Sequence, residues 1–431
     1  MHSADTIFAL SSGAPPAAIA IIRISGSVAF DVVRGLAGKL PRPRQASLNV
    51  LRLPGNTEVL DEALVLVFPG PNSATGEDLA ELHLHGGRAV VRAVEDAISS
   101  FPLTRRAEAG EFTRRAFANG RIDLNEAEGL SDLLSAETEW QRKAASLMFG
   151  GAFSIAIEGW RQEVLRLSAL TEAELDFSDE DDVDSQNKYA ITIGCGNICD
   201  EISRMLANPL VEKLKDGLRV VLAGPPNSGK STLLNALVGR DAAIVSDIAG
   251  TTRDMIEVPV SVEGIGVLFT DTAGLRDDSL DVIERIGIER SHAAMQQADI
   301  VLWLGRERVG PDHPNVIEVA TKCDTVGHER KGAPAISVSA VTGAGIAELL
   351  HSVAERAKIL LPPPDQFAVN ARQRALLADV GAALDACKDL EDWLIIGENL
   401  RQARLALDAL TGRAHTEELL DNIFGKFCVG K

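Results

Sequence analysis

The chain has 431 residues, of which 45% are hydrophobic and 24% are charged, and its formal net charge is −19. This length predicts two to four domains, each with its own core, and the composition excludes a wholly disordered chain. The negative charge argues against a protein that coats nucleic acid through bulk positive charge, although it allows a local nucleic-acid site. No apolar run reaches the ~20 residues of a transmembrane helix, and the five scattered cysteines suggest no disulfide framework. We therefore expect a cytoplasmic protein without a membrane association.

Residues 1–120 are predicted to form a mixed α+β domain. Short apolar runs at residues 18–24 and 63–68 lie between Gly and Pro residues, as strands do. Residues 79–85 alternate between apolar and polar side chains, which also indicates a strand. The segment after Gly87 predicts a helix over residues 88–99.

Helical periodicity dominates residues 121–216 and returns in residues 362–431. In the first block, apolar residues between Phe153 and Leu167 recur every three or four positions and share one helical face. In the second block one predicted stripe consists of Leu376, Val380, Ala383, Cys387 and Leu390, and another of Leu400, Ala403, Leu407 and Leu410.

Residues 217–361 alternate strand-like and helix-like segments, which is typical of a parallel α/β sheet. The predicted architecture is therefore multi-domain α/β. It consists of an N-terminal domain (1–120), a discontinuous helical domain (121–216 and 362–431) and an inserted α/β domain (217–361). Such an insertion is physically easy because the termini of a domain often lie close together.

A phosphate-binding loop begins the inserted domain. Residues 224–231, Gly-Pro-Pro-Asn-Ser-Gly-Lys-Ser, fit the pattern G-x-x-x-x-G-K-[ST] between an apolar run and a helix-like segment. In such a loop the backbone N–H groups surround phosphate oxygens. Lys230 would place a positive charge at the outer phosphates, and the Ser231 hydroxyl would bind Mg²⁺.

Further motifs follow in the order found in GTPases. Residues 250–254 offer hydroxyls for Mg²⁺ and the γ-phosphate, and residues 271–274 offer a carboxylate and a backbone N–H. Asp324 would accept two hydrogen bonds from guanine, a pair that adenine cannot donate. Together the motifs predict that residues 217–361 form a Ras-like P-loop G domain, and a GTPase rather than an ATPase. The predicted GTP-binding residues are Asn227, Ser228, Gly229, Lys230, Ser231, Thr232, Ser246, Asp247, Ile248, Ala249, Gly250, Thr251, Thr252, Asp271, Thr272, Ala273, Gly274, Thr321, Lys322, Asp324, Ser339 and Ala340.

Two residues depart from the usual GTPase pattern. Thr321 stands where an Asn usually helps to pin the base, which affects the expected nucleotide affinity more than the identity of the base. Leu275 stands where Ras-like enzymes place a water-orienting Gln, and an aliphatic side chain cannot orient water. We therefore expect another polar group to perform this task.

Several stretches together resemble one family. They are residues 22–26, 75–78, 110–113, 115–117, 123–128, 247–254, 271–276, 283–290 and the C-terminal Phe-Cys-Val-Gly-Lys of residues 427–431. Over nearly its whole length the chain resembles the MnmE (TrmE) family of P-loop GTPases, which modify the wobble uridine of tRNA.

The resemblance implies a homodimer formed through an N-terminal domain that binds a one-carbon tetrahydrofolate in its 5-formyl or methylene form. It also implies a heterotetramer with an FAD-dependent partner, MnmG, on which alone FAD and NADH are expected. Together such proteins add an aminomethyl or carboxymethylaminomethyl group to carbon 5 of uridine 34 in certain tRNAs. Their G domains hydrolyse GTP when K⁺ allows them to dimerise.

Motif matching to the family implies the residues of each site. The K⁺ ligands would be Asn227, Ser246, Ile248 and Thr251, the Mg²⁺ ligands Ser231 and Thr252, and the folate-binding residues Arg23, Glu81, Arg121 and Lys431. Glu284 is the candidate for the missing catalytic group, acting with Lys230. Cys428 would be a tail thiol near the one-carbon donor, whereas the residues alone favour a small buried hydrophobic residue, which a free Cys more often is.

Two other functions remain open from the sequence. A ribosome-assembly GTPase of the Era or EngA kind has similar G-domain motifs, but such proteins carry basic RNA-binding modules and this chain is acidic. The other alternative is a folate-binding interaction module with a vestigial G domain. The intact Lys230, Ser231, Thr252, Asp271 and Asp324 argue against it.

Overall fold

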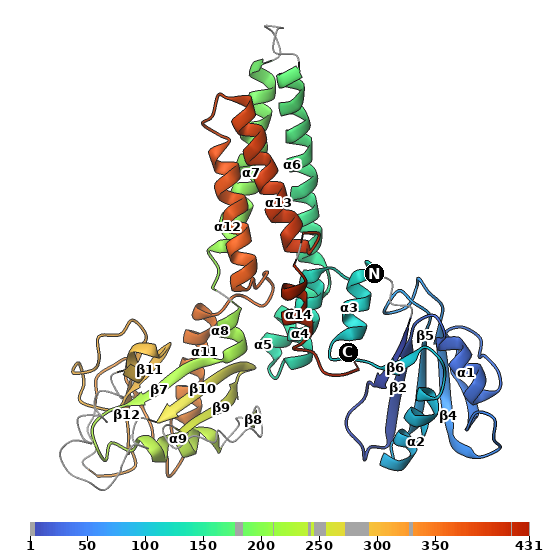
Figure 1. Ribbon diagram of the computed structural model, residues 1–431. Helices are drawn as coiled ribbons and strands as arrows, with labels where there is room; N and C mark the ends of the chain where they lie inside the picture. The colour runs from blue at the N-terminus through green and yellow to red at the C-terminus, as the bar shows by residue number, and fades with distance from the viewer. Residues whose placement is uncertain are drawn as a thin grey trace. The chain divides into compact units, whose positions relative to one another are not determined.

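The computed structural model describes residues 5–176, 184–209, 211–239, 243–244, 256–271, 293–326, 331–414 and 416–430. Its contacts divide the chain into two units, residues 1–131 with 408–431 and residues 132–407. Figure 1 labels the helices and strands of both units. Two helices, α4 (Leu124–Ser135) and α13 (Trp393–Thr411), cross the boundaries between the units.

A six-stranded sheet organises the first unit, in the order β3-β4-β5-β2-β1-β6. Neighbouring strands are antiparallel except for β1 and β6, which are parallel. The elements of this unit besides α4 are β1 (Thr6–Leu10), β2 (Ile19–Ser25), α1 (Ala29–Ala37), β3 (Ser47–Arg52), β4 (Val59–Phe68), β5 (Leu79–His85), α2 (Arg88–Ser99), β6 (Thr104–Arg106), α3 (Glu111–Ala118) and α14 (Glu417–Phe424).

The two faces of this sheet have different neighbours because side chains alternate along a strand. Phe8, Ile22 and Leu82 point to one face, where they join residues of α1 and α2 in the main core of the unit. Ile7 and Ala9 point to the other face and pack with the region of α3. The predicted strands at 18–24, 63–68 and 79–85 and the helix at 88–99 are confirmed.

The C-terminal segment packs within the first unit. Phe424 of α14 and the following Phe427 are buried in a small apolar cluster with Leu124 and Ala127 of α4. The Phe117 ring of α3 lies 6.0 Å from the Phe424 ring, measured between centroids. The end of the chain is therefore held against α3 and α4.

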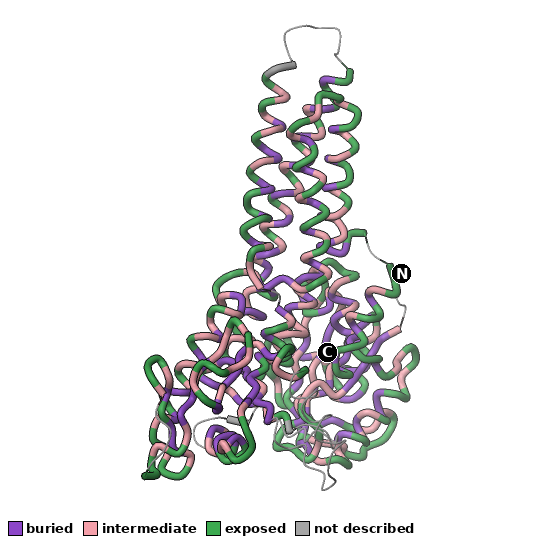
Figure 2. The backbone as a smooth tube through the Cα atoms, turned by 90° about the vertical axis from the view of Figure 1, so that its left-hand side faces the viewer, coloured by how far each residue is buried: buried purple, intermediate pink, exposed green. Residues whose placement is uncertain are grey.

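The helical part of the second unit consists of α5 (Glu139–Phe149), α6 (Ala152–Asp176), α7 (Asp184–Leu206), α8 (Glu212–Asp216) and α12 (Ala371–Ala386), with α13. The long helices α6, α7, α12 and α13 lie side by side as a bundle whose buried residues face inward (Figure 2). The predicted stripes from Phe153 to Leu167 and from Leu400 to Leu410 are confirmed as buried. Within the described residues, no helix is both long enough and apolar enough to span a membrane.

The predicted stripe that begins on α12 is confirmed at Val380 and Cys387 and wrong at its other three positions. Leu377, Val380, Leu384 and Cys387 are buried, whereas Leu376, Ala383 and Leu390 are only half-buried. Both sets recur every three or four residues, so periodicity alone could not separate them. Helix α12 packs against α7, where the Cys199 thiol donates to the Gly381 carbonyl oxygen at 3.6 Å.

A seven-stranded sheet completes the second unit, in the order β13-β12-β11-β7-β10-β9-β8. Its strands and helices are β7 (Leu218–Ala223), α9 (Lys230–Val238), β8 (Ala243–Ile244), β9 (Ile256–Val262), β10 (Ile265–Asp271), β11 (Ile300–Trp303), β12 (Val316–Ala320), β13 (Ile336–Ser337) and α11 (Ile346–Leu360). The prediction of a parallel sheet is right from β13 to β10 but wrong for β8 and β9, which are antiparallel to their neighbours. Glu263 and Gly264, with φ of 49° and 80°, close the tight turn that reverses the chain there.

Candidate functional site

The phosphate-binding loop joins β7 to α9. Gly229, the residue before α9, has φ 95°, and Asn227 has φ 63°, so the loop turns tightly into the helix. Lys230 is buried, and its Nζ donates to the carbonyl oxygens of Gly224 at 2.9 Å and Pro225 at 3.0 Å. The positive charge is therefore held across the loop, where the phosphate oxygens of a nucleotide would lie.

A hydroxyl and a carboxylate meet beside this lysine. The Ser231 hydroxyl donates to Asp271 Oδ2 at 2.5 Å, and Asp271 is buried at the end of β10. Serine and aspartate oxygens are the hard donors that Mg²⁺ prefers, so the pair fits a Mg²⁺ site. Ser228 Oγ is buried without a hydrogen-bond partner among the described residues, and a phosphate oxygen would supply one.

The base-recognition segments lie at the ends of β12 and β13. Thr321 Oγ1 donates to the Ser228 carbonyl oxygen at 2.8 Å, and Lys322 Nζ donates to the Asn227 carbonyl oxygen at 2.9 Å. Thr321, which replaces the usual Asn, thus still ties this segment to the phosphate-binding loop. Asp324 is exposed, whereas Ser339 is fully buried.

The rest of the predicted nucleotide site lies outside the described residues. This holds for Ser246, Asp247, Ile248, Ala249, Gly250, Thr251, Thr252, Thr272, Ala273, Gly274 and Glu284, and for Lys431 of the folate set. Of the predicted K⁺ ligands only Asn227 is described, and of the Mg²⁺ ligands only Ser231.

A second group of polar residues lies on the sheet of the first unit. Arg23 on β2 is directly opposite Glu81 on β5, and Arg23 Nη2 donates to Glu81 Oε1 at 2.9 Å. His83 Nε2 lies 3.3 Å from Glu81 Oε2, and the Arg23 guanidinium lies 5.9 Å from the Phe112 ring centre. His83 and Glu81 are two positions apart on β5, and residues two apart in a strand share a face.

The C-terminal tail lies beside the same part of the sheet. Val429 forms an antiparallel bridge with Ala109, and Ser11 Oγ donates to the Gly430 carbonyl oxygen at 2.8 Å. Ser11 directly follows β1, whose Ala9 is paired with Arg23. The tail therefore brings the residue before Lys431 to the strand next to Arg23, and Cys428 is exposed there.

A cavity of about 340 Å³ lies beside the tail. Its lining includes Phe8, Leu10, Ser12, Glu95, Arg106 and Val429. An ion pair of 2.9 Å between Arg106 Nη1 and Glu95 Oε2 lies in this lining.

Two family models match the chain: the MnmE helical domain over residues 124–428, and the GTP-binding protein TrmE N-terminus over residues 6–121. The tRNA modification GTPase MnmE of Erythrobacter litoralis is 54% identical over 99% of this chain and 100% of that protein. The protein of the same name from Novosphingobium aromaticivorans is 52% identical over 99% and 100%. The chain belongs to the MnmE family.

Similarity to solved structures covers less of the chain. Era from Aquifex aeolicus bound to GDP.AlF4⁻ is 26% identical, covering 38% of this chain and 66% of that one, with a TM-score of 0.26. The G domain of the FeoB iron transporter of T. maritima is also 26% identical, covering 32% and 98%, with a TM-score of 0.24. At these TM-scores the likeness supports no conclusion.

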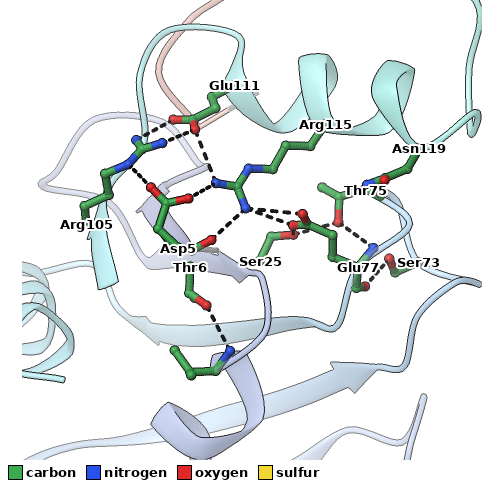
Figure 3. A network of polar contacts seen from close by, with 11 residues as sticks. Asp5, Thr6, Ser25, Ser73, Thr75, Glu77, Arg105, Glu111, Arg115 and Asn119 are labelled. Atoms are coloured by element: carbon green, nitrogen blue, oxygen red, sulfur yellow. Dashed lines mark hydrogen bonds and ion pairs between the residues drawn. The ribbon is translucent and has the colours of Figure 1, made fainter. Parts of the chain in front are cut away.

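MnmE-family motifs of the first unit meet in a buried polar network around Arg115 (Figure 3). The Arg115 side chain, only 8% exposed, donates to Asp5 Oδ1 at 3.0 Å, Glu77 Oε2 at 3.1 Å and Glu111 Oε1 at 3.4 Å. Arg105 forms ion pairs with both Asp5 and Glu111. The network joins the start of β1, the 75–78 motif and the 110–117 motif, which are distant in the sequence.

Two carboxyl groups of this network have shifted pKa values. Burial by itself would raise the pKa of Glu111, but hydrogen bonds and the positive charges of Arg105 and Arg115 outweigh burial and lower this pKa below its usual value. The pKa of Asp5 is lowered in the same way, again against a burial effect. Both groups are therefore held as carboxylates.

Proposed function

We propose that this MnmE-family chain is a GTP hydrolase of tRNA modification. With an FAD-dependent partner, MnmG, it adds an aminomethyl or carboxymethylaminomethyl group to carbon 5 of uridine 34. The observation that carries the proposal is the match at 54% identity, which covers 99% of this chain and 100% of the relative. This one chain contains both the phosphate-binding loop and the Arg23–Glu81 pair. The Era or EngA alternative is not favoured, because the match extends across the non-GTPase domains.

In the proposed GTP site, Lys230 neutralises the charge of the outer phosphates and Asp324 selects guanine. Ser231 and Thr252 would hold Mg²⁺, with Asp271 beside them, and the ion when bound supplies positive charge at the phosphates. Support comes from the 2.5 Å contact of Ser231 with Asp271 and from Ser228 Oγ, which has no hydrogen-bond partner in the part of the chain that the structure describes.

Potassium would be held by Asn227, Ser246, Ile248 and Thr251. A monovalent cation there would complement phosphate charge in the place of an arginine finger. Glu284 would then orient the attacking water, because Leu275 cannot do so.

The proposed folate site uses the sheet face of the first unit. Arg23 suits the two carboxylates of the folate glutamate, and Glu81 suits the donor edge of the pterin. Arg121 and Lys431 would complete the set, and the docked Val429 and Gly430 support placing Lys431 nearby. A one-carbon tetrahydrofolate bound here would supply the carbon for the modification, with Cys428 exposed beside it.

We also propose a homodimer, a heterotetramer with MnmG, a cytoplasmic location and the four-segment domain division given above. The homodimer is supported by apolar side chains on the open face of the first-unit sheet. Leu48 and Leu64 are paired across β3 and β4 yet are 60% and 43% exposed, and Ile19 is 59% exposed. Isolated apolar residues are common on protein surfaces. A group of exposed apolar residues on one sheet instead favours a face that is covered by another protein chain.

The test is mass spectrometry of tRNA nucleosides from a strain that lacks this protein. We expect the modified uridine to disappear and to return with the wild-type gene. A Lys230→Ala gene and one without the last four codons should both fail to restore it. The truncated protein should still hydrolyse GTP, whereas Lys230→Ala should not. Unchanged wobble uridine in the deletion strain would overturn the proposal.

A further inference from the structure

We infer that Arg115 is a positioning residue for the folate site, because it fixes helix α3 and α3 sets the positions of Arg23, Arg121 and the C-terminal tail. This inference rests on the proposed folate function. Arg115 does not belong to the residues matched to folate, and it is buried away from solvent.

Arg115 fastens the middle of α3 to two other parts of the unit. Besides the carboxylates of Asp5 and Glu111, it contacts Glu77 in the loop before β5 and donates to the Asp5 carbonyl oxygen at 3.0 Å. Glu77 is itself held by the Ser25 hydroxyl at 2.8 Å (Figure 3). A guanidinium can serve several acceptors in different directions at once, whereas a lysine ammonium is a single point.

The N-terminal end of α3 receives the tail. Glu111 accepts a hydrogen bond from the Glu108 N–H at 2.9 Å, which shapes the turn before the helix. Within that turn Ala109 pairs with Val429, and the Gly110 N–H donates to the Cys428 carbonyl oxygen at 3.5 Å. Since Arg115 and Arg105 hold Glu111, they also hold the backbone against which the tail docks.

Two further contacts link α3 to the folate residues. Phe112, in the first turn of the helix, lies beneath the Arg23 guanidinium. Just past the other end, the Arg121 N–H donates to the Ala116 carbonyl oxygen at 2.8 Å, and Asn119 Nδ2 donates to the Thr75 carbonyl oxygen at 2.7 Å. A shift of α3 would therefore displace Arg23, Arg121 and the tail together.

The test compares Arg115→Met and Arg115→Lys in the full-length protein with Arg34→Met. Arg34 is an exposed arginine of α1 in the same unit and pairs with Asp31, three positions before it. Binding is measured by calorimetry with 5-formyltetrahydrofolate. We expect Arg115→Met to weaken folate binding about 10- to 100-fold. This is the loss expected when the displaced folate residues no longer form one or two of their charged hydrogen bonds with the ligand. We expect Arg115→Lys to be intermediate and Arg34→Met to match wild type.

A second readout needs no folate. Amide hydrogen exchange of residues 424–430 should be faster in Arg115→Met than in wild type, while peptides from β4 and β5 stay unchanged. GTP hydrolysis should be unaffected. A purely structural role would accelerate exchange across the whole unit. If exchange is faster across the whole unit in Arg115→Met, the milder variant Glu77→Gln decides. This substitution keeps the side-chain shape and removes one charged partner of Arg115, and it should still accelerate amide exchange of the tail and weaken folate binding.

The outcomes separate this inference from the proposed function. If the wild-type protein does not bind the folate, the folate proposal fails, while tail exchange still tests whether Arg115 holds α3. If wild type binds folate and both Arg115→Met and Glu77→Gln retain wild-type affinity and tail exchange, Arg115 is not a positioning residue.

Discussion

Gly430→Ala should release the C-terminal tail while leaving the rest of the first unit folded. Gly430 has φ 97°, a backbone conformation that costs an alanine about 1–3 kcal/mol. An added Cβ would also lie 2.3 Å from the Leu10 carbonyl oxygen, which is 0.7 Å inside the 3.0 Å that real Cβ atoms respect. Because the obstacle is strand backbone, the tail has to move rather than its neighbour.

The size of the effect follows from these contacts. Moving the tail stretches the 2.8 Å hydrogen bond from Ser11 Oγ to the Gly430 carbonyl oxygen, a loss of about 1 kcal/mol. With the backbone cost, the docked tail is destabilised by about 2–4 kcal/mol. At 1.4 kcal/mol per tenfold, the ratio of docked to undocked tail falls by about 30- to 1000-fold.

Amide hydrogen exchange of residues 424–430 measures this ratio directly. The matched control is Gly38→Ala, because Gly38 also has a positive φ, 74°, but an added Cβ there meets nothing within 4 Å. We expect fast tail exchange and weakened folate binding only in Gly430→Ala, with GTP hydrolysis unchanged in both variants. Wild-type tail exchange in Gly430→Ala would refute the reasoning that backbone contact with Leu10 fixes the tail.

Three further predictions concern the titration of the first unit and the chemistry of the G domain. Asp5 and Glu111 have lowered pKa values, so the stability that they contribute is present above the usual carboxyl values of 3.8 and 4.5 and is lost as the pH falls through the lower folded-state values. Denaturant unfolding should therefore show a steep loss of stability below about pH 4, and Glu111→Gln should flatten it; equal slopes would contradict the assignment. Replacing KCl by NaCl at equal ionic strength should sharply lower GTP turnover, because Na⁺ is smaller than the proposed K⁺ site requires, and equal rates would rule that site out. Glu284→Ala should lower kcat by about 10²- to 10⁴-fold with little change in GTP affinity. A native rate for that variant in KCl would make Arg276 or Asp277 the next residue to test.

Local sequence patterns were sufficient for the motifs and for most individual elements. The phosphate-binding loop is a contiguous segment in which Lys230 donates to the backbone of Gly224 and Pro225, so its motif can be found without the rest of the fold. The strand at 79–85 and the helix at 88–99 likewise follow from alternation and helical periodicity. The family resemblance likewise rests on short contiguous stretches, such as residues 123–128 and 427–431.

Choices between locally equivalent arrangements needed tertiary structure. The two candidate stripes on α12 have the same period, and only their burial in the structure distinguishes Leu377 and Leu384 from Leu376 and Ala383. The antiparallel β9 reads like any other apolar strand, and its direction depends on the turn at Glu263 and Gly264. Neither the choice of stripe on α12 nor the direction of β9 can be predicted from the residues of that segment alone, because the alternatives have similar local energies.

The sequence by itself therefore predicted the phosphate-binding loop, because residues 224–231 are contiguous along the chain. Only the tertiary structure decided how distant segments meet. Ser11 and Gly430 form a hydrogen bond although 419 positions separate them, and Arg115 joins Asp5, Glu77 and Glu111 from three segments. Such contacts leave no periodic signal, because their partners are brought together by the burial of the cores between them.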